Sequence, residues 1–190
     1  GDVYKRQRYE APVLEAGNAS KRKTASKGAG GTEQSTGEIS SPFVHLHLHS
    51  QYSVLQATPE VEDIVKAARD GGMEAVAITD FGNLFGAFKF VAAAKSAGIK
   101  AILGCEYFLS EERKKNKFTK ENPDRRHHQV LLAKNETGYR NLCRLSSLGY
   151  TEGLYGIHPR IDKELVAAHA EGLIATTGSI HSEISALILH

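Results

Sequence analysis

Cysteine is scarce in this chain of 190 residues, which has only Cys105 and Cys143. They form no C-x-x-C pair, which argues against a disulfide framework and against a zinc site made of thiolates. Cys105 lies in an apolar run and is interpreted as a small buried residue. No apolar run approaches the roughly 20 residues of a membrane span, and no segment has the order of a signal peptide. We therefore expect a cytoplasmic protein with no membrane partner.

The chain also lacks a large net charge. Its formal charge of +2 is too close to zero to predict nucleic-acid binding from bulk charge. Hydrophobic residues make up 41% of the chain, which is typical of a globular protein. The length is sufficient for one ordinary domain with its own core.

Methionine is limited to Met73, and the first residue is Gly1. Residues 184–190 read as a helix without a stop signal, so we expect a fragment of a longer protein. Residues 1–7 resemble translated sequencing-adapter sequence and receive no functional interpretation. Residues 17–40 are rich in Gly, Ser, Thr, Lys and Ala, a composition that cannot bury enough surface to fold.

We expect residues 1–41 to be a disordered, flexible linker or a non-native leader, and residues 42–190 to be one truncated domain. The basic cluster at 21–23 has two interpretations, a contact with nucleic acid or a solvated run of charge, and the second is favoured.

Strands and helices alternate from Phe43 onward. Strands are predicted at 43–49, 75–79, 101–109, 129–133 and 173–177, and an exposed loop at 110–126. Helices are predicted from an N-cap at Thr58 to Gly71, then at 85–97 and 136–148, from a cap at Asp162 to His169, and from Ser182. This rhythm favours an α/β fold with parallel strands. It fits most of a β/α barrel or an open sheet.

The clearest chemical signal is the run His45-Leu46-His47-Leu48-His49. Alternate residues of a strand point to the same side, so three imidazoles are expected on one face. Imidazole nitrogen is a good ligand for zinc, manganese or iron. The alternative is a set of partly exposed strand histidines without a metal.

Three further positions join the candidate site. Asp80 follows a buried strand, where parallel α/β folds place active sites, but it also suits a cap of the next turn. Glu106 lies inside an apolar strand, and a carboxylate there needs a metal or a histidine as partner. The pair His127-His128 opens another strand, although either residue also suits the surface.

These pieces, in this order, resemble the PHP (polymerase and histidinol phosphatase) family. The similarity covers about 43–190 and rests on the blocks 47–53, 79–83, 104–106 and 128–134. It implies a distorted, TIM-barrel-like β/α barrel of the PHP type, incomplete at its C-terminus, that binds up to three metal ions. The blocks 131–142, 146–153 and 159–162 are more similar to alpha subunits of bacterial DNA polymerase III than to free-standing phosphatases.

The sequence departs from the family pattern at three ligand positions. Active members carry Asp where this chain has Gln56, and His where it has Phe81. Many alpha subunits carry Cys where this chain has Ser179. A phenyl ring has no lone pair for a metal, and bridging metals need anionic oxygens. The resemblance leaves four matched ligands, which are His47, His49, Glu106 and His128. We expect one weakly bound zinc or manganese ion, with His45 and Asp80 nearby.

The resemblance implies that the parent protein is a DNA-directed DNA polymerase whose own domain uses magnesium and lies outside this chain. The segment is then a scaffold without a catalytic residue of its own. Implied partners are the polymerase thumb and other domains of the same chain, DNA, a proofreading exonuclease and a sliding clamp. The alternatives are an active phosphoesterase or 3′–5′ exonuclease, and a module for protein interaction only.

Overall fold

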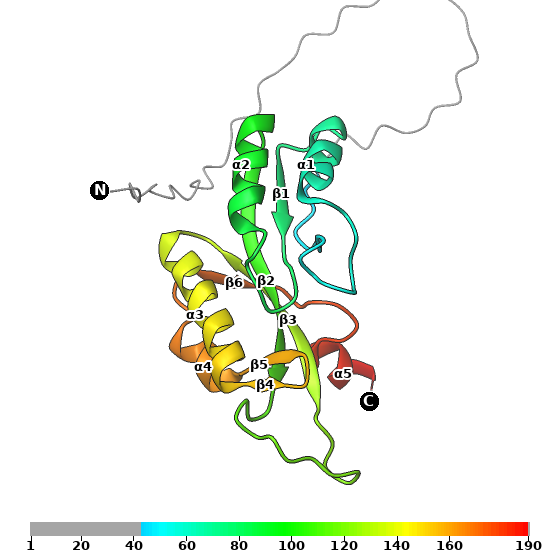
Figure 1. The fold of residues 1–190 in the computed structure, drawn as a ribbon, viewed down its shortest axis with the longest axis vertical. Coiled ribbons are helices and arrows are strands. Elements are labelled where there is room, and N and C mark those ends of the chain that lie inside the picture. The colour runs from blue at the N-terminus through cyan, green and yellow to red at the C-terminus, as the bar shows by residue number, and fades with distance from the viewer. Residues whose placement is uncertain (1–42, 190) are drawn as a thin grey trace, which may run out of the picture.

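The computed structural model describes residues 43–189, so the predicted linker at 1–41 lies outside the described residues. Figure 1 shows the elements from α1 in cyan to α5 in red. In chain order they are α1 (Val61–Asp70), β1 (Ala75–Ile78), α2 (Ala87–Ala97), β2 (Lys100–Ser110), β3 (Arg126–Ala133), α3 (Glu136–Glu152), β4 (Leu154–Tyr155), β5 (His158–Asp162), α4 (Lys163–Ala168), β6 (Leu173–Ala175) and α5 (Glu183–Leu189).

The long strand β2 organises the sheet. Its first half pairs with β1 and its last residues pair with β5, both in parallel. Strand β3 runs antiparallel along β2 and pairs with β6, and β4 pairs with β5, both also antiparallel. The predicted α/β class is confirmed, and the described strands do not close into a barrel. The expectation of parallel strands alone is wrong, because β2 and β3 are joined by a loop without the helix that a parallel crossover needs.

Two apolar clusters surround this sheet. Helices α1 and α2 pack on β1 through residues such as Val61, Phe90 and Val76. Helix α3 packs on β2 and β5 through Leu142 and Leu145, among other residues. The two groups of helices lie toward opposite ends of β2 (Figure 1). Within residues 43–189, no helix is both long and apolar enough to cross a membrane.

The predicted start of the first helix is wrong by two residues. Helix α1 begins at Val61, and its N-cap residue Glu60 is extended and makes no side-chain cap. The side chain of Gln51 accepts the backbone N–H of Val61 at 3.1 Å instead. A distant loop therefore supplies the acceptor that Thr58 was expected to supply, and Pro59 lies before the helix.

The predicted strand at 43–49 is also wrong, since this segment makes no regular ladder. The N–H of Ala77 bonds the carbonyl of His45 at 2.9 Å, and the N–H of Thr79 bonds that of Leu48 at 2.7 Å. The donors are two residues apart and the acceptors three residues apart. The segment therefore gains one residue relative to β1, as at a bulge, and the expected alternation is broken there.

Most other boundaries agree with the sequence. The second helix ends at Gly98, which is left-handed, and Asp162 caps α4 by accepting the N–H of Leu165. Strand β3 begins at Arg126, three residues before the predicted start, because β2 continues to Ser110 and pairs with it. Strands β4 and β5 were not predicted.

A close approach of two glycines fixes α3 against the turn before β6. A Cβ on Gly138 would overlap the carbonyl oxygen of Gly172, whose φ is +72°. The N–H of Gly138 also caps the helix by donating to the side chain of Asn135 at 2.9 Å. By contrast, a Cβ on Gly149, which is buried in the same helix, would meet its neighbours at 3.5 Å, an ordinary contact.

We predict that Gly138→Ala lowers the free energy of unfolding by about 1–3 kcal/mol or more, as expected for an overpacked site against backbone. Gly149→Ala is the matched control and should be neutral or stabilising by about 0.5–1 kcal/mol, because Ala favours the helix. Urea unfolding followed by circular dichroism measures both. Equal effects of the two substitutions would contradict the packing described.

Candidate metal centre

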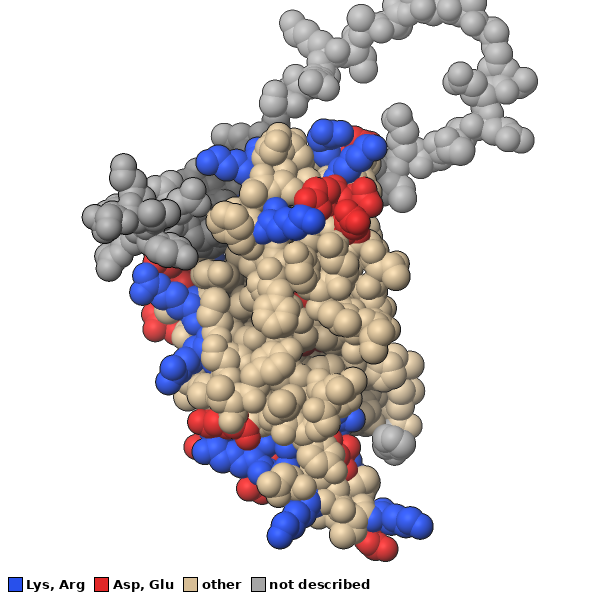
Figure 2. All heavy atoms as spheres, viewed as in Figure 1, with Lys and Arg blue, Asp and Glu red and all other residues tan. Residues whose placement is uncertain are grey.

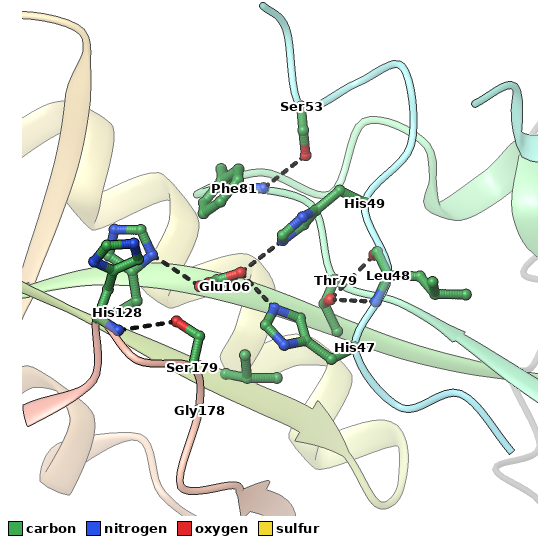
Figure 3. Close-up of polar contacts among 12 residues, drawn as sticks. His47, Leu48, His49, Ser53, Thr79, Phe81, Glu106, His128, Gly178 and Ser179 are labelled. Carbon is green, nitrogen blue, oxygen red and sulfur yellow. Dashed lines mark hydrogen bonds and ion pairs between the residues drawn. The ribbon is translucent and has the colours of Figure 1, made fainter. Parts of the chain in front are cut away.

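The candidate centre is built around the carboxylate of Glu106, whose residue is 1% exposed. Its Oε2 atom lies 2.6 Å from Nε2 of His47 and 2.6 Å from Nε2 of His49. Its Oε1 atom lies 2.9 Å from Nδ1 of His128. Figure 3 shows the three rings converging on this one carboxylate. All four predicted ligands therefore lie together, although they come from segments far apart in the sequence.

Backbone pairing brings these side chains together. Glu106 and His128 lie on β2 and β3, where Phe108 is the register partner of His128. The two other histidines lie on the segment that is hydrogen-bonded to β1 and to Thr79. Thr79 at the end of β1 holds the residue between them, because its Oγ1 atom bonds both the N–H and the carbonyl of Leu48 at 3.1 Å (Figure 3).

The histidines control the charge of Glu106. Burial alone would raise the pKa of this carboxyl group. The hydrogen bonds with His128, His49 and His47 outweigh burial and hold the pKa of Glu106 well below its usual range. The centre therefore contains an ionised carboxylate, surrounded by imidazoles, at neutral pH.

Phe81 fills the space beside the histidines. Its ring stacks on His49 with centroids 4.2 Å apart. It also meets the ring of His128 edge to face, with centroids 5.4 Å apart. Its backbone bridges to Glu106 in parallel. The side chain is therefore placed at the centre, as its sequence position implied, but it contributes an apolar surface instead of a ligand atom.

The two other altered positions have different surroundings. Gln56 lines an open hollow that His47, His49 and Pro59 also line. The Oγ atom of Ser179 accepts the N–H of His181 at 3.2 Å, and the carbonyl of His181 accepts the N–H of His128 at 2.9 Å. Ser179 therefore supports the backbone next to His128.

Asp80 was predicted to lie near the site, either as a ligand or as a cap. Its Oδ1 atom accepts the N–H of Ser50 and the hydroxyl of Ser53, each at 2.7 Å, and its Oδ2 atom accepts the hydroxyl of Ser50 at 2.8 Å. These bonds anchor the loop that follows His49. His45 makes an edge contact with Phe43 at 4.7 Å and does not contact Glu106.

Two histidines at the rim of the centre were not predicted from the sequence. The ring of His158 contacts Phe108 with centroids 4.7 Å apart, and the ring of His181 lies 5.3 Å from that of His128. Burial lowers the pKa of His158, and the charge of Arg126 lowers it further. Only the parallel pairing of β5 with β2 brings His158 here, and β5 was not predicted.

The residues present suit one metal ion. One ligand atom each from His47, His49 and Glu106 lies within 4.8 Å of the other two. Two imidazoles and one carboxylate form a donor set that zinc accepts in proteins. Among residues 43–189, Glu106 is the one carboxylate of this group. Both oxygens of Asp80 are bonded to Ser50 and Ser53.

Comparison with known proteins gives the family. The profile described as the PHP domain matches residues 45–190, which is most of the chain. The chain belongs to the PHP domain family. The PHP domain match includes the whole cluster around Glu106.

The chain is similar to curated DNA polymerase III alpha subunits. It is 46% identical over 147 residues to that of Treponema pallidum, covering 77% of this chain and 12% of the relative. It is 47% identical over 152 residues to that of Borreliella burgdorferi, covering 78% and 13%. It is 43% identical over 147 residues to that of Aquifex aeolicus, covering 75% of this chain and 13% of the relative. This PHP domain chain thus spans about one eighth of these relatives.

Two solved structures are also similar. One is a candidate metal-dependent phosphoesterase from Bifidobacterium adolescentis, with a TM-score of 0.38 and 20% identity over 56% of this chain and 34% of that one. The other is an amidohydrolase from Chromobacterium violaceum, with a TM-score of 0.38 and 22% identity over 60% of this chain and 40% of that one.

We predict that Glu106→Gln makes the free energy of unfolding depend less on pH in the acid range. The folded-state pKa of Glu106 lies below the usual value of 4.5 for this group, so ionised Glu106 stabilises the fold above about pH 4.5. That contribution is lost as the pH falls from there toward the folded-state pKa. Urea unfolding with a chelator present, from about pH 6 to 3, should give a steeper loss in the wild type than in Glu106→Gln.

The matched control is Glu164→Gln, which removes an exposed carboxyl group of α4. Its acid profile should follow the wild type. At neutral pH, Glu106→Gln should cost about 1–3 kcal/mol, because three imidazoles lose a charged partner. Superimposable acid profiles for the wild type and Glu106→Gln would refute the assignment.

Proposed function

We propose that this chain is the PHP segment of a replicative DNA polymerase alpha subunit, where it acts as a scaffold with one metal site. The supporting observation is the ring of Phe81, stacked on His49 where active relatives are expected to carry a ligand. The parent protein synthesises DNA with magnesium-dependent chemistry that lies elsewhere. Its partners are DNA, the thumb and other domains of the same chain, a proofreading exonuclease and a sliding clamp, in the cytoplasm.

His47, His49 and Glu106 would hold the ion, with His128 bonded to the second oxygen of Glu106. A zinc or manganese ion supplies a Lewis acid that lowers the pKa of bound water. The chain's residues contribute two neutral donors, one negative charge and a dry aromatic wall made by Phe81 and Phe108, whose centroids lie 5.7 Å apart. A centre with one carboxylate does not balance the charge of several bridging metals.

We predict that the purified chain retains at most one zinc or manganese ion. His47→Ala should weaken metal affinity by more than roughly 10–100-fold, which is the loss typical when a residue that only orients a ligand is replaced. His45→Ala is the matched control from the same segment and should leave affinity unchanged, because its ring contacts Phe43. Metal content by mass spectrometry after dialysis measures all three proteins.

A gain-of-ligand variant sharpens the same measurement. Phe81→His places an imidazole beside His49 and His128 and should raise metal retention, whereas Phe81→Leu should not. Equal metal content in the wild type and His47→Ala would contradict the proposed site. Equal effects of His and Leu at position 81 would contradict the role given to Phe81.

We further predict that the wild-type chain does not degrade single-stranded DNA in excess manganese or zinc. The physical reason is the single carboxylate at the centre, which cannot support the bridged metals of an active phosphoesterase. Gel analysis of an end-labelled oligonucleotide measures this. Robust turnover that His47→Ala abolishes would establish the alternative, an active PHP phosphoesterase or 3′–5′ exonuclease.

A further inference from the structure

The loop between β2 and β3 concentrates positive charge. Residues 111–126, which are this loop together with Arg126, the first residue of β3, contain seven Lys or Arg and four Asp or Glu side chains, a net charge of +3. The whole chain carries only +2, so the net charge of this short segment is larger than that of the entire protein. Figure 1 shows the loop at the lower tip of the molecule, and Figure 2 shows Lys and Arg side chains projecting there below a broad uncharged face.

Buried contacts hold the base of this loop. The side chain of Arg160, 1% exposed, donates through Nη2 to the carbonyls of Arg113 and Lys115 at 2.9 and 2.6 Å, and through Nη1 to Asp124 at 3.0 Å. The guanidinium of Arg113 binds Asp162 and Glu152 at 2.9 and 2.8 Å. These contacts brace the loop from both of its ends.

The rings of Phe118 and Tyr155 complete this support. The guanidinium carbon of Arg160 lies 5.3 Å from the centroid of Phe118 and 5.0 Å from that of Tyr155. The two rings meet edge to face at 4.8 Å. Such cation–π contacts favour a fixed position for the loop. The outward-facing basic groups are therefore presented on a braced support.

Three of these basic side chains are exposed and have no ion pair among the described residues, whereas the half-buried Lys115 lies over the ring of Phe118. Lys117, Lys120 and Arg125 are exposed, whereas Arg113, Lys114 and Arg126 pair with carboxylates. Cations that are free of internal partners are available to bind phosphates. Glu106 precedes the end of β2 by four residues, or about 13 Å at the usual strand rise, so the loop lies beyond one end of the metal centre.

We infer that the loop at 111–126 binds the phosphate backbone of single-stranded nucleic acid without reading its sequence. Lys117, Lys120 and Arg125 make the contacts, and Arg160 and Arg113 position them. The bound strand lies on the outer end of β2 and β3, the strands that carry Glu106 and His128. This binding does not depend on the metal centre, because none of the three contacting residues belongs to it.

Fluorescence anisotropy of a labelled oligothymidylate of about 20 nucleotides, a length that spans typical single-strand sites, tests the inference with the full 190-residue chain. The loop variant combines Lys117→Ala, Lys120→Ala and Arg125→Ala. The control combines Lys66→Ala, Lys95→Ala and Arg144→Ala, which removes the same charges from exposed positions of α1, α2 and α3. The basic residues 21–23 are common to all proteins compared. A chelator in every sample separates the result from metal binding.

The wild type and the control should bind alike. The loop variant should bind at least about tenfold more weakly at low salt, and the slope of log affinity against log salt should fall by about 2, as expected for three lost single-strand phosphate contacts. Equal losses in both variants would overturn the inference, because diffuse charge would then explain binding. Undiminished binding by the loop variant would overturn it too. Competition by polyglutamate as effective as unlabelled oligothymidylate would assign the loop to acidic protein segments instead.

Discussion

The buried carboxylate of Glu106 is the interaction on which the described fold and its site both depend. An ionised group this deep in a protein is strongly unfavourable unless it is fully hydrogen-bonded. His47, His49 and His128 supply these partners and come from two segments that no backbone ladder joins directly. The cluster therefore fastens the N-terminal segment to β2 and β3, in addition to offering ligands.

The strand that carries Glu106 connects the candidate centre, the mixed sheet and the basic loop. Strand β2 pairs with β1 at its beginning, with β3 along most of its length and with β5 at its end. The side chains that line the centre are set by these registers, since His128 lies opposite Phe108 and β5 adds His158 against the same ring. The end of β2 also begins the basic loop, which Arg160 on β5 braces.

The sequence was sufficient to single out the four side chains that cluster, but not to predict the way they are held. Glu106 was identifiable because a lone carboxylate in an apolar strand demands partners. The alternation at 45–49 correctly drew attention to His47 and His49, yet the strand it predicts does not form. The additional residue opposite β1 depends on long-range hydrogen bonds from Ala77 and Thr79, which periodicity does not record.

The other misses have the same physical origin. Thr58 is a good N-cap by local preference, but Gln51 reaches Val61 from another segment and the helix begins later. Asp80 was open to two interpretations because a carboxylate after a strand suits both a ligand and a cap. Its bonds to Ser50 and Ser53 are tertiary contacts, as are the pairings that bring His158 and His181 to the rim.

The ring of Phe81 connects the chemistry of the centre to its stability. An imidazole at this position would need a metal or a hydrogen-bond partner, whereas a phenyl ring packs on His49 and Phe108 without one. The same ring shields the bonds of Glu106 from water, which strengthens them. This cluster therefore has a physical reason to keep His47, His49, Glu106 and His128 that does not depend on a metal. Their mutual hydrogen bonds support the fold when no ion is bound, and an ion held by His47, His49 and Glu106 would take the place of the bonds between them.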